Sequence, residues 1–323
     1  MKPRGFIDLH THGIGSYDTR TADPRDILKM ADLYGRAGTA AFVPTIYPGP
    51  LEEMRDNMEA VRKAMVVQKA KGKGQRAKTN SSPITHHSSL ILGVHLEGPF
   101  LNPVRAGALD RDSFMGPSLS SLKKLIEGYE DLIRLITIAP EMSGALSIIG
   151  RCVSAGITVS MGHSDATYRQ AEEGKRAGAS CVTHLFNAMR PLHHREPGLA
   201  GFGLLDGDVY VEIIADGAHL HRKTLELIFS AKRSDRIILV SDSVRGAKPG
   251  GSPRYGKGGG LEGSGGVIGD SVRLLGGMGV PADAIAKIGA RNPVRLLTKN
   301  NRSYKIGFPL TPPGKSEDKN VRR

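Results

Sequence analysis

The sequence predicts an α/β protein with the architecture of a (β/α)8 barrel, and three observations support this prediction. Short apolar runs alternate along the chain with longer segments that have the periodicity of amphipathic helices. Eight such runs occur, which is the number of strands in a closed TIM barrel. The runs are apolar throughout, as expected for parallel strands that are buried on both faces.

The predicted elements follow one another in a regular order. Strands are predicted at residues 5–12, 39–47, 89–98, 133–141, 157–164, 180–189, 210–221 and 236–244. Helices are predicted at residues 23–38, 51–69, 118–132, 143–156, 167–178 and 222–233, with a last helical stretch at 270–297. The first helix begins at an Asp-Pro pair and ends at a glycine, which are typical start and stop signals. Repeated strand-helix units predict parallel strands joined by right-handed crossovers.

One barrel domain is predicted for residues 1–298, and two segments depart from its rhythm. Residues 70–88 are rich in Gly, Lys and Ser, which predicts a long exposed loop between the second helix and the third strand. Residues 299–323 have no helix or strand signal and predict a disordered C-terminal tail. The sixth crossover, around HHREPGLAGFG, is the irregular one.

The chain is basic, with a formal net charge of +13. Many of the basic residues lie in 68–78 and in the C-terminal tail, so we interpret them as solvated segments and expect no nucleic-acid partner. A positive field also attracts small anionic substrates. Cys152 and Cys181 have no pairing pattern, which predicts a reducing cytoplasm. The N-terminus has no signal-peptide core, and no apolar run is long enough to span a membrane.

Polar residues gather at the predicted C-terminal ends of the strands, where barrels of this kind carry their functional groups. They are His10 and His12, Glu97, His163, His184, His219 and Asp242. Any one histidine there could be an ordinary hydrogen-bonded rim residue. Strand ends converge on one mouth, however, and imidazoles with carboxylates make a site for one or two divalent transition metals. His10 and His12 are two residues apart on a strand, so both point to the same side.

Several motifs then resemble a known family. They are GFIDLHTHG, GVHLEGPFLNP, MGHSDAT, THLFNAM, REPGLAG, IADGAHLH and LVSDSV. In this order they resemble the amidohydrolase superfamily and, within it, the N-acetylglucosamine-6-phosphate deacetylase family. The resemblance extends from about residue 3 to about residue 297. The His-x-His pattern is shared across the superfamily, whereas HLEGPFLNP and the FNAM and REPG motifs are more specific.

The resemblance implies a role for each matching residue. Glu97, His163 and His184 would bind a metal, and His10 and His12 would hold a second ion where one is present. Zinc is the expected metal, with iron, cobalt or manganese as alternatives. Asp242 would be the general acid/base.

The family also implies a set of substrate-binding residues. They are Asn187, Ala188, Arg195, His219, Ala108, Leu109, Leu261, Glu262 and Gly263. Arg195 matches a phosphate-binding arginine that reaches across a dimer interface, so a homodimer is expected. An alternative role for Arg195 is a surface ion pair with Glu196.

The chemistry of these residue types agrees with those roles. A metal lowers the pKa of bound water toward about 7 and so supplies hydroxide to attack an otherwise inert acetamide. Asp242 could accept the proton of that water and later deliver it to the leaving amine. An arginine binds phosphate through paired donors. The resemblance implies that the products are glucosamine-6-phosphate and acetate.

Three features depart from the family, one of which is the 70–88 loop, longer than the family's connection there. Leu109 stands where the family has a histidine that helps to polarise the carbonyl, and leucine cannot donate a hydrogen bond. The family also has a small β-sandwich built from segments on both sides of the barrel, and this chain is expected to lack it because only about five residues precede the first strand. A barrel without that domain exposes surface that an oligomer or partner could cover.

Three alternatives therefore stay open. Leu109 favours an amidohydrolase that acts on a different N-acyl or cyclic amide, although REPG and FNAM argue against it. A catalytically weak relative kept for binding is a second possibility, against which the complete set of metal-type residues and Asp242 stand. The net charge of +13 suggests a third possibility, a nucleic-acid-binding protein. This alternative predicts strongly salt-dependent binding to DNA or RNA.

Overall fold

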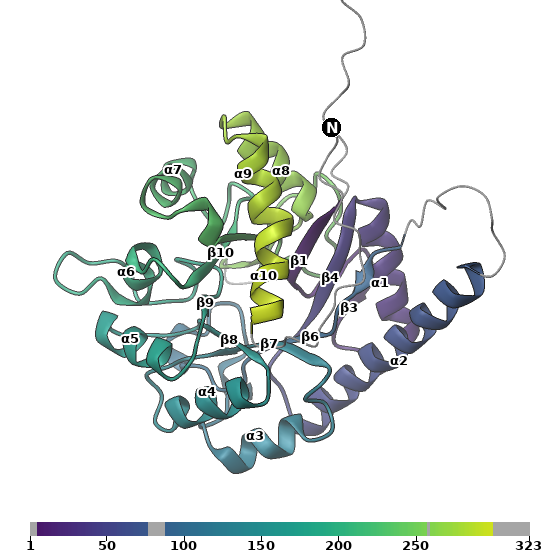
Figure 1. The fold of residues 1–323 in the computed structure, drawn as a ribbon, viewed down its shortest axis with the longest axis horizontal. Helices are drawn as coiled ribbons and strands as arrows, with labels where there is room; N and C mark the ends of the chain where they lie inside the picture. The colour runs from purple at the N-terminus through teal and green to yellow at the C-terminus, as the bar shows by residue number, and fades with distance from the viewer. Residues whose placement is uncertain (1–4, 77–87, 257–258, 300–323) are drawn as a thin grey trace, which may run out of the picture.

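Eight parallel strands curl into a nearly closed barrel with helices outside it, as predicted (Figure 1). The computed structural model describes residues 5–76, 88–256 and 259–299. Neighbouring strands pair in chain order around the barrel. They are β1 (Phe6–Thr11), β4 (Thr39–Ile46), β6 (Val94–Glu97), β7 (Ile133–Ile138), β8 (Thr158–Met161), β9 (Cys181–Val182), β10 (Tyr210–Ile214) and β11 (Ile237–Val240).

The first and last strands meet at the mouth of the barrel. A parallel bridge joins Thr11 to Ser243, just beyond the end of β11. The His12 amide donates to the Ser243 carbonyl at 2.8 Å, and the Asp242 amide donates to the His10 carbonyl at 2.9 Å. Closure therefore places the start and the end of the barrel, with their polar residues, side by side.

The helices cover the outer face of the strands (Figure 1). They are α1 (Pro24–Arg36), α2 (Leu51–Arg76), α3 (Leu119–Ile126), α4 (Ala145–Ser154), α5 (Tyr168–Arg176), α6 (Gly198–Leu205), α7 (Arg222–Ala231), α8 (Ile268–Gly277), α9 (Ala282–Ala286) and α10 (Asn292–Lys299), with a π-helix at Lys287–Arg291 and 3-10 turns at Pro103–Arg105, Arg111–Ser113 and Ser234–Arg236. In α1, the Asp23 side chain caps the Arg25 amide. Ile27, Met30, Ala31 and Tyr34 of α1 recur at helical spacing and are buried.

Every barrel strand is shorter than its predicted range, and two of the predicted strands differ most. The third run is divided into β5 (Leu90–Ile91) and β6, because Gly93 between them adopts a φ of +137° and a Cβ there would lie 2.5 Å from the Leu132 carbonyl oxygen. The sixth run, predicted at 180–189, keeps only the two residues of β9 as strand. The rest turns sharply, with positive φ values at His184, Phe186 and Ala188.

The segment boundaries also need correction. Helix α2 continues to Arg76, so residues 70–76 are helical rather than part of the predicted loop. Lys, Gln and Arg there are good helix formers, and they outweigh the two glycines. The remainder of that loop, 77–87, lies outside the described residues, as does the predicted tail from 300 on. Lys299 itself still belongs to α10, and the long helical stretch at 270–297 is interrupted near Gly279, which has a φ of +84°.

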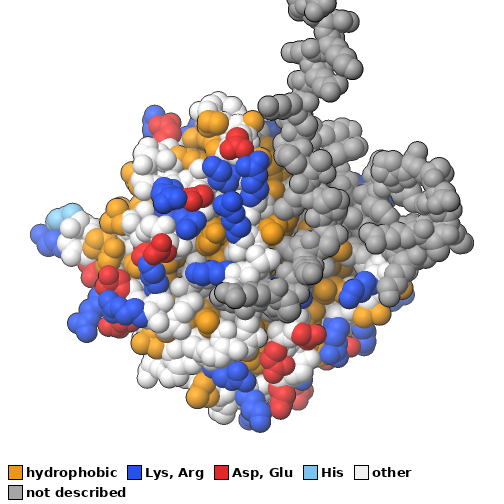
Figure 2. All heavy atoms as spheres, in the orientation of Figure 1, with side chains coloured by type: hydrophobic (Ala, Val, Ile, Leu, Met, Phe, Trp, Pro, Cys, Tyr) orange, Lys and Arg blue, Asp and Glu red, His pale blue; other side chains and the backbone are white. Residues whose placement is uncertain are grey.

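Helix α10 lies across the N-terminal end of the barrel, in front of the strands in Figure 1. Its Leu296 and Leu297 join the apolar cluster that fills this half of the interior, with Ile7, Leu135 and Ile238 among its members. Figure 2 shows basic and acidic side chains interspersed over the described part of this face. This apolar cluster fills the N-terminal end of the barrel, so the polar residues lie at the opposite, C-terminal end of the strands.

Beyond the barrel, the described residues form two small two-stranded sheets. Strands β2 (Gly13–Ile14) and β3 (Tyr17–Asp18) follow β1, and β12 (Arg254–Tyr255) pairs with β13 (Leu261–Gly263) after β11. Both therefore extend from C-terminal strand ends, at the mouth. None of the helices in the described ranges is long and apolar enough to cross a membrane.

A buried lysine makes the stability of the fold dependent on pH. The Lys232 amine donates to the carbonyls of Gly203 and Asp206 at the end of α6, and burial lowers its pKa from 10.5 to about 8. Between these values the unfolded chain binds more protons, so stability should rise with pH. Relative to Lys232→Met, the free energy of unfolding should gain roughly 2–3 kcal/mol from pH 8 to 10.5. Urea unfolding across this window measures it; parallel profiles for the two proteins would contradict it.

Candidate metal centre

The predicted metal-type residues come together at the mouth of the barrel. Six of them form two groups, whose possible ligand atoms lie within 4.8 Å of one another in each group. One group is His10, His12 and Asp242, and the other is Glu97, His163 and His184. Their positions follow from the strands: His10 lies on β1, Glu97 ends β6, and the other residues come just after the ends of β1, β8, β9 and β11.

Glu97 belongs to the second group but also contacts histidines of the first. Its Oε1 is 3.1 Å from the Nε2 atoms of His10 and His163 and 3.2 Å from that of His184. Its Oε2 is 3.1 Å from His12 Nε2. Asp242 approaches from the other side, with Oδ1 3.6 Å from the Nε2 atoms of both His10 and His12. One carboxylate thus faces four imidazoles.

Three of these residues have an unusual backbone conformation. His163, His184 and Asp242 have φ values of +46°, +29° and +50°, and each lies two residues beyond the end of its strand. Non-glycine residues adopt this left-handed region infrequently, and such strain clusters at functional sites. The turn after each of these strands aims a side chain at the centre of the mouth.

The nitrogen atoms that face the centre fit a divalent metal. His10 Nε2 is buried and faces carboxylate oxygens of Glu97 and Asp242, at 3.1 and 3.6 Å. The Nε2 atoms of His163 and His184 lie only 3.1 Å apart, so two neutral lone pairs would repel there. Imidazole nitrogens and carboxylate oxygens converging in this way are typical ligands of zinc and its neighbours among the transition metals.

Burial and charge act against each other on these groups. Burial lowers the pKa of His10, but Glu97 and Asp242 outweigh it and hold that pKa well above its usual value. Burial raises the pKa of Glu97, but His10 and the other imidazoles hold it well below its usual value. The centre therefore favours ionised carboxylates next to positive charge, which a metal cation would also supply.

Several residues that surround the centre are not among the predicted site residues. Glu212 of β10 is fully buried, with Oε2 3.4 Å from His10 Nδ1. Asp216 accepts from His219 Nδ1 at 2.8 Å. His95 of β6 is also buried and packs edge-to-face on the His10 ring, with centroids 4.7 Å apart. A polar residue within an apolar strand is the signal that would have revealed Glu212 and His95.

Several predicted substrate-binding residues lie close to this centre. His219 Nε2 is 4.0 Å from Asp242 Oδ2. The Asn187 side chain donates to the His184 carbonyl at 3.2 Å, and Ala188 follows with a φ of +47°. The loop with Ala108 and half-buried Leu109 also reaches this region, since a Cβ on Gly107 would lie 3.1 Å from Ala188 Cβ and 3.6 Å from the His163 ring.

The other predicted substrate-binding residues differ in their placement. Gly263 of β13 lies beside Asp242, because a Cβ on it would be 3.1 Å from the Asp242 carbonyl oxygen. Leu261 is half-buried and Glu262 is exposed in the same strand. Arg195 is exposed in the loop before α6, and the structure does not bring it into the cluster. The expected alternative, an ion pair between Arg195 and Glu196, is not formed among the described residues; the Glu196 carboxylate instead accepts from the Tyr168 and Gly198 amides.

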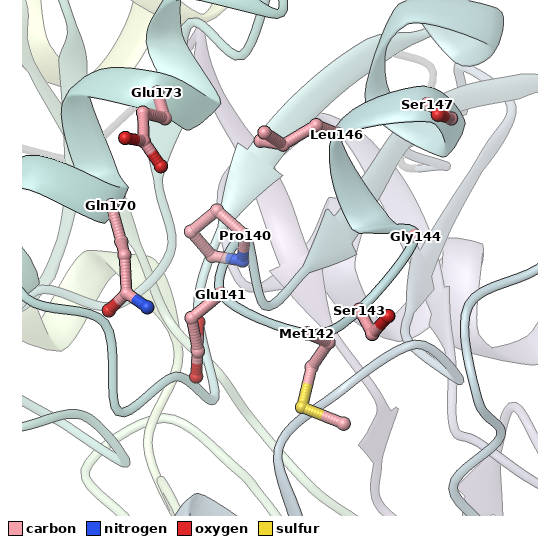
Figure 3. A pocket seen from close by; sticks show the side chains of 9 residues that line it. All are labelled: Pro140, Glu141, Met142, Ser143, Gly144, Leu146, Ser147, Gln170 and Glu173. Carbon is pink, nitrogen blue, oxygen red and sulfur yellow. The ribbon is translucent and has the colours of Figure 1, made fainter.

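A separate hollow of about 270 Å³ lies beside the mouth, between the loop after β7 and helices α4 and α5. Figure 3 shows Glu141, Gln170 and Glu173 on its wall. The Glu141 carboxylate already accepts hydrogen bonds from the Asn102 and Ser164 side chains and from the Asp165 amide. The hollow shares no lining residue with the metal-type cluster, so it is distinct from the candidate reaction centre.

Comparison with known proteins agrees with the fold and the donor set. The amidohydrolase family model matches residues 4–251. The chain therefore belongs to the amidohydrolase family. This family implies a divalent metal, and the two groups of converging donors are its candidate ligands. The structure does not identify the metal.

Two relatives carry the names of deacetylases of phosphorylated amino sugars. The chain is 34% identical over 241 residues to the N-acetylglucosamine-6-phosphate deacetylase of Lysinibacillus sphaericus, covering 75% of this chain and 58% of the relative. It is 31% identical over 242 residues to the N-acetylgalactosamine-6-phosphate deacetylase of Escherichia coli O157:H7, covering 75% of this chain and 59% of the relative. The chain thus spans a little under three fifths of each.

A solved structure gives the same fold. It is a variant of the Mycobacterium smegmatis N-acetyl-D-glucosamine-6-phosphate deacetylase in complex with N-acetyl-D-glucosamine-6-phosphate. The two chains superpose with a TM-score of 0.77 at 29% identity, over 91% of this chain and 77% of that one. The resemblance found in the sequence motifs is confirmed at the level of family and fold.

Proposed function

We propose that this protein is a metal-dependent deacetylase that converts N-acetylglucosamine-6-phosphate to glucosamine-6-phosphate and acetate. The observation that carries the proposal is the position of Asp242, whose Oδ1 lies 3.6 Å from the Nε2 atoms of both His10 and His12. A carboxylate at this place is adjacent to the donor cluster and is partly accessible from the mouth. The names of the relatives supply the substrate class.

Asp242 serves as the general acid/base. A bound divalent metal supplies a hydroxide nucleophile at neutral pH and polarises the acyl carbonyl. Asp242 accepts the proton released from the attacking water and delivers it to the amide nitrogen as the C–N bond breaks. The amine then leaves neutral, and acetate remains. The left-handed backbone at Asp242 fixes the carboxylate for both transfers.

Two metal ions, most suitably zinc, fit the arrangement of the donors. Glu97 offers Oε1 to the side of His163 and His184, and it offers Oε2 to the side of His12. Oε1 is also 3.1 Å from His10 Nε2, so the Glu97 carboxylate would contribute negative charge to an ion held by either group. Glu97, His163 and His184 would hold one ion, and His10, His12 and Asp242 would hold the other.

Other residues would bind the sugar phosphate. His219 is fixed by Asp216 at 2.8 Å and is directed at Asp242, so it is placed to contact a sugar hydroxyl. Asn187, Ala188 and the loops with Leu109 and Gly263 form the surroundings. Leu109 offers no hydrogen-bond donor to the acyl carbonyl, so a bound metal would have to polarise that carbonyl.

We place the protein in the cytoplasm, since Cys152 and Cys181 are buried and unpaired.

Arg195 would bind the phosphate of the neighbouring subunit in a homodimer. Its side chain is exposed and forms no ion pair within the described residues, so it is free for a partner's ligand. Arg195→Ala should raise KM for the phosphorylated sugar by roughly 10-fold or more, because a charge-assisted hydrogen bond contributes about 1.5–3 kcal/mol. The same variant should leave KM for unphosphorylated N-acetylglucosamine nearly unchanged. Steady-state kinetics with both sugars decides it, and equal changes would remove the phosphate role.

Product identification tests the proposed reaction. The zinc-loaded protein is incubated with N-acetylglucosamine-6-phosphate, and proton NMR follows the acetyl methyl signal. The proposal predicts equal amounts of free acetate and glucosamine-6-phosphate. Intact substrate with folded, metal-loaded protein would reject it. The galactosamine epimer is measured in parallel, because one relative carries that name.

A different amide substrate is the second candidate, and Leu109 is the observation that favours it. An apolar residue at this position suits a bulkier or less polar acyl group than acetyl. Faster hydrolysis of a longer N-acyl or cyclic amide than of the acetyl sugar would support this candidate.

A further inference from the structure

A buried carboxylate, Glu212, contacts His10 at Nδ1, the ring nitrogen that faces away from the metal centre. Glu212 is 0% exposed, and its Oε2 lies 3.4 Å from His10 Nδ1. Its Oε1 has no hydrogen-bond partner in the described part of the chain. A carboxylate is costly to bury with so few partners, so its presence in the barrel interior needs a reason.

The His10 ring is a neutral imidazole with one donor and one acceptor nitrogen when it binds a metal. A hydrogen bond from Nδ1 to Glu212 assigns the proton to Nδ1 and leaves the lone pair on Nε2. Nε2 is the atom that lies 3.1 Å from Glu97 and 3.6 Å from Asp242. Glu212 therefore selects the tautomer that directs the free nitrogen into the centre.

The packing around His10 supports the same orientation. His95 contacts the ring edge-to-face, at 4.7 Å and an interplanar angle of 82°. His95 is itself fixed by a 2.9 Å hydrogen bond between its Nε2 and Thr137 Oγ1. The ring thus has little freedom to rotate away from Glu212.

The other predicted ligands differ in this respect. His163 Nδ1 lies 3.0 Å from a backbone carbonyl, that of Arg105. The Nδ1 atoms of His12 and His184 have no hydrogen-bond partner within the described ranges. Among the described residues, Glu212 is therefore the one side chain that holds the outer nitrogen of a predicted histidine ligand.

We propose that Glu212 is a positioning residue of the metal centre. Glu212 orients His10 and so increases the affinity of the site for the ion that His10 binds. The inference rests on the proposed metal site, but it does not depend on the substrate. Hydrogen-bonded partners of metal-ligating histidines generally contribute 10–100-fold to affinity. The carboxylate also adds negative charge near the ion, which favours a cation.

Zinc binding by the purified full-length chain tests the proposal. The metal-free wild type, Glu212→Gln and Glu212→Leu are titrated with Zn²⁺ against a chromophoric chelator of known affinity. Glu212→Gln keeps an acceptor oxygen without the charge, so it should lose less affinity than Glu212→Leu. Asp216→Asn is the matched control, because Asp216 holds a histidine Nδ1 in the same way but His219 is in neither ligand group.

The expected result is a 10–100-fold weaker Kd for at least one ion in Glu212→Leu. Glu212→Gln should lie between it and wild type, while Asp216→Asn stays within about twofold. The thermal midpoint of metal-free Glu212→Gln, near that of wild type, excludes a folding defect. Unchanged zinc affinity in both Glu212 variants, or an equal loss in Asp216→Asn, would overturn the proposal. Wild type that binds zinc normally but releases no acetate would reject the proposed function alone.

Discussion

Asp242→Asn is expected to lower kcat by about 10²–10⁴-fold, the usual contribution of a general acid/base. The carboxylate must both accept a proton and return it to the amine, and an amide side chain can do neither. Asparagine retains an oxygen near the position of Oδ1, 3.6 Å from His10 and His12, so zinc should remain bound. Kinetics on N-acetylglucosamine-6-phosphate, with zinc content measured on the same samples, gives both quantities.

Two comparisons separate this role from a structural one. Wild type and variant should have similar KM values, because the proton transfers belong to the transition state rather than to substrate binding. Ser241→Ala, beside Asp242 but directed at Asp8, is a neighbouring control expected to retain turnover. Turnover by Asp242→Asn within a few-fold of wild type would remove Asp242 as the acid/base.

Glu97→Ala should have the largest effect on metal binding. This side chain faces four imidazoles, at 3.1–3.2 Å from their Nε2 atoms. Its removal takes away the central anionic ligand. The imidazoles would then have to bind the cation without the negative charge of Glu97. Zinc affinity should fall by more than about 100-fold, since even an indirect partner contributes 10–100-fold. Activity should fall with it.

Glu141→Gln is the matched control for that change. Glu141 also lies at the mouth, after β7, but its carboxylate accepts hydrogen bonds from protein groups and belongs to neither donor group. This control should lose some stability and keep its zinc. Full zinc content in Glu97→Ala, measured by elemental analysis after dialysis, would contradict the assignment of Glu97.

The sequence predicted the barrel because each strand is a continuous apolar run, and burial on both faces requires this. It also predicted which side chains meet at the mouth, since polar residues at strand ends of a closed barrel converge. Glu97, His163 and His184 come together from three strands in this way. Both results depend on patterns that are local in the chain.

Other features depend on contacts that the pattern does not contain. The break at Gly93 follows from the close approach of the Leu132 carbonyl, which is distant in sequence. Glu212 was hidden in an apolar strand, and only the folded barrel shows that it reaches His10. Residues 70–76 are helical although their glycines favour a loop, because the Lys, Gln and Arg residues among them are good helix formers.

The most direct test of the account is acetate release as zinc is returned to the metal-free protein. N-acetylglucosamine-6-phosphate is supplied at saturation, and the rate is plotted against zinc per chain. The account predicts no turnover without metal and a rate that rises to a plateau at one or two equivalents, with kcat/KM of about 10⁴ M⁻¹s⁻¹ or more. Full activity in the metal-free protein, or none at saturating zinc, would contradict it.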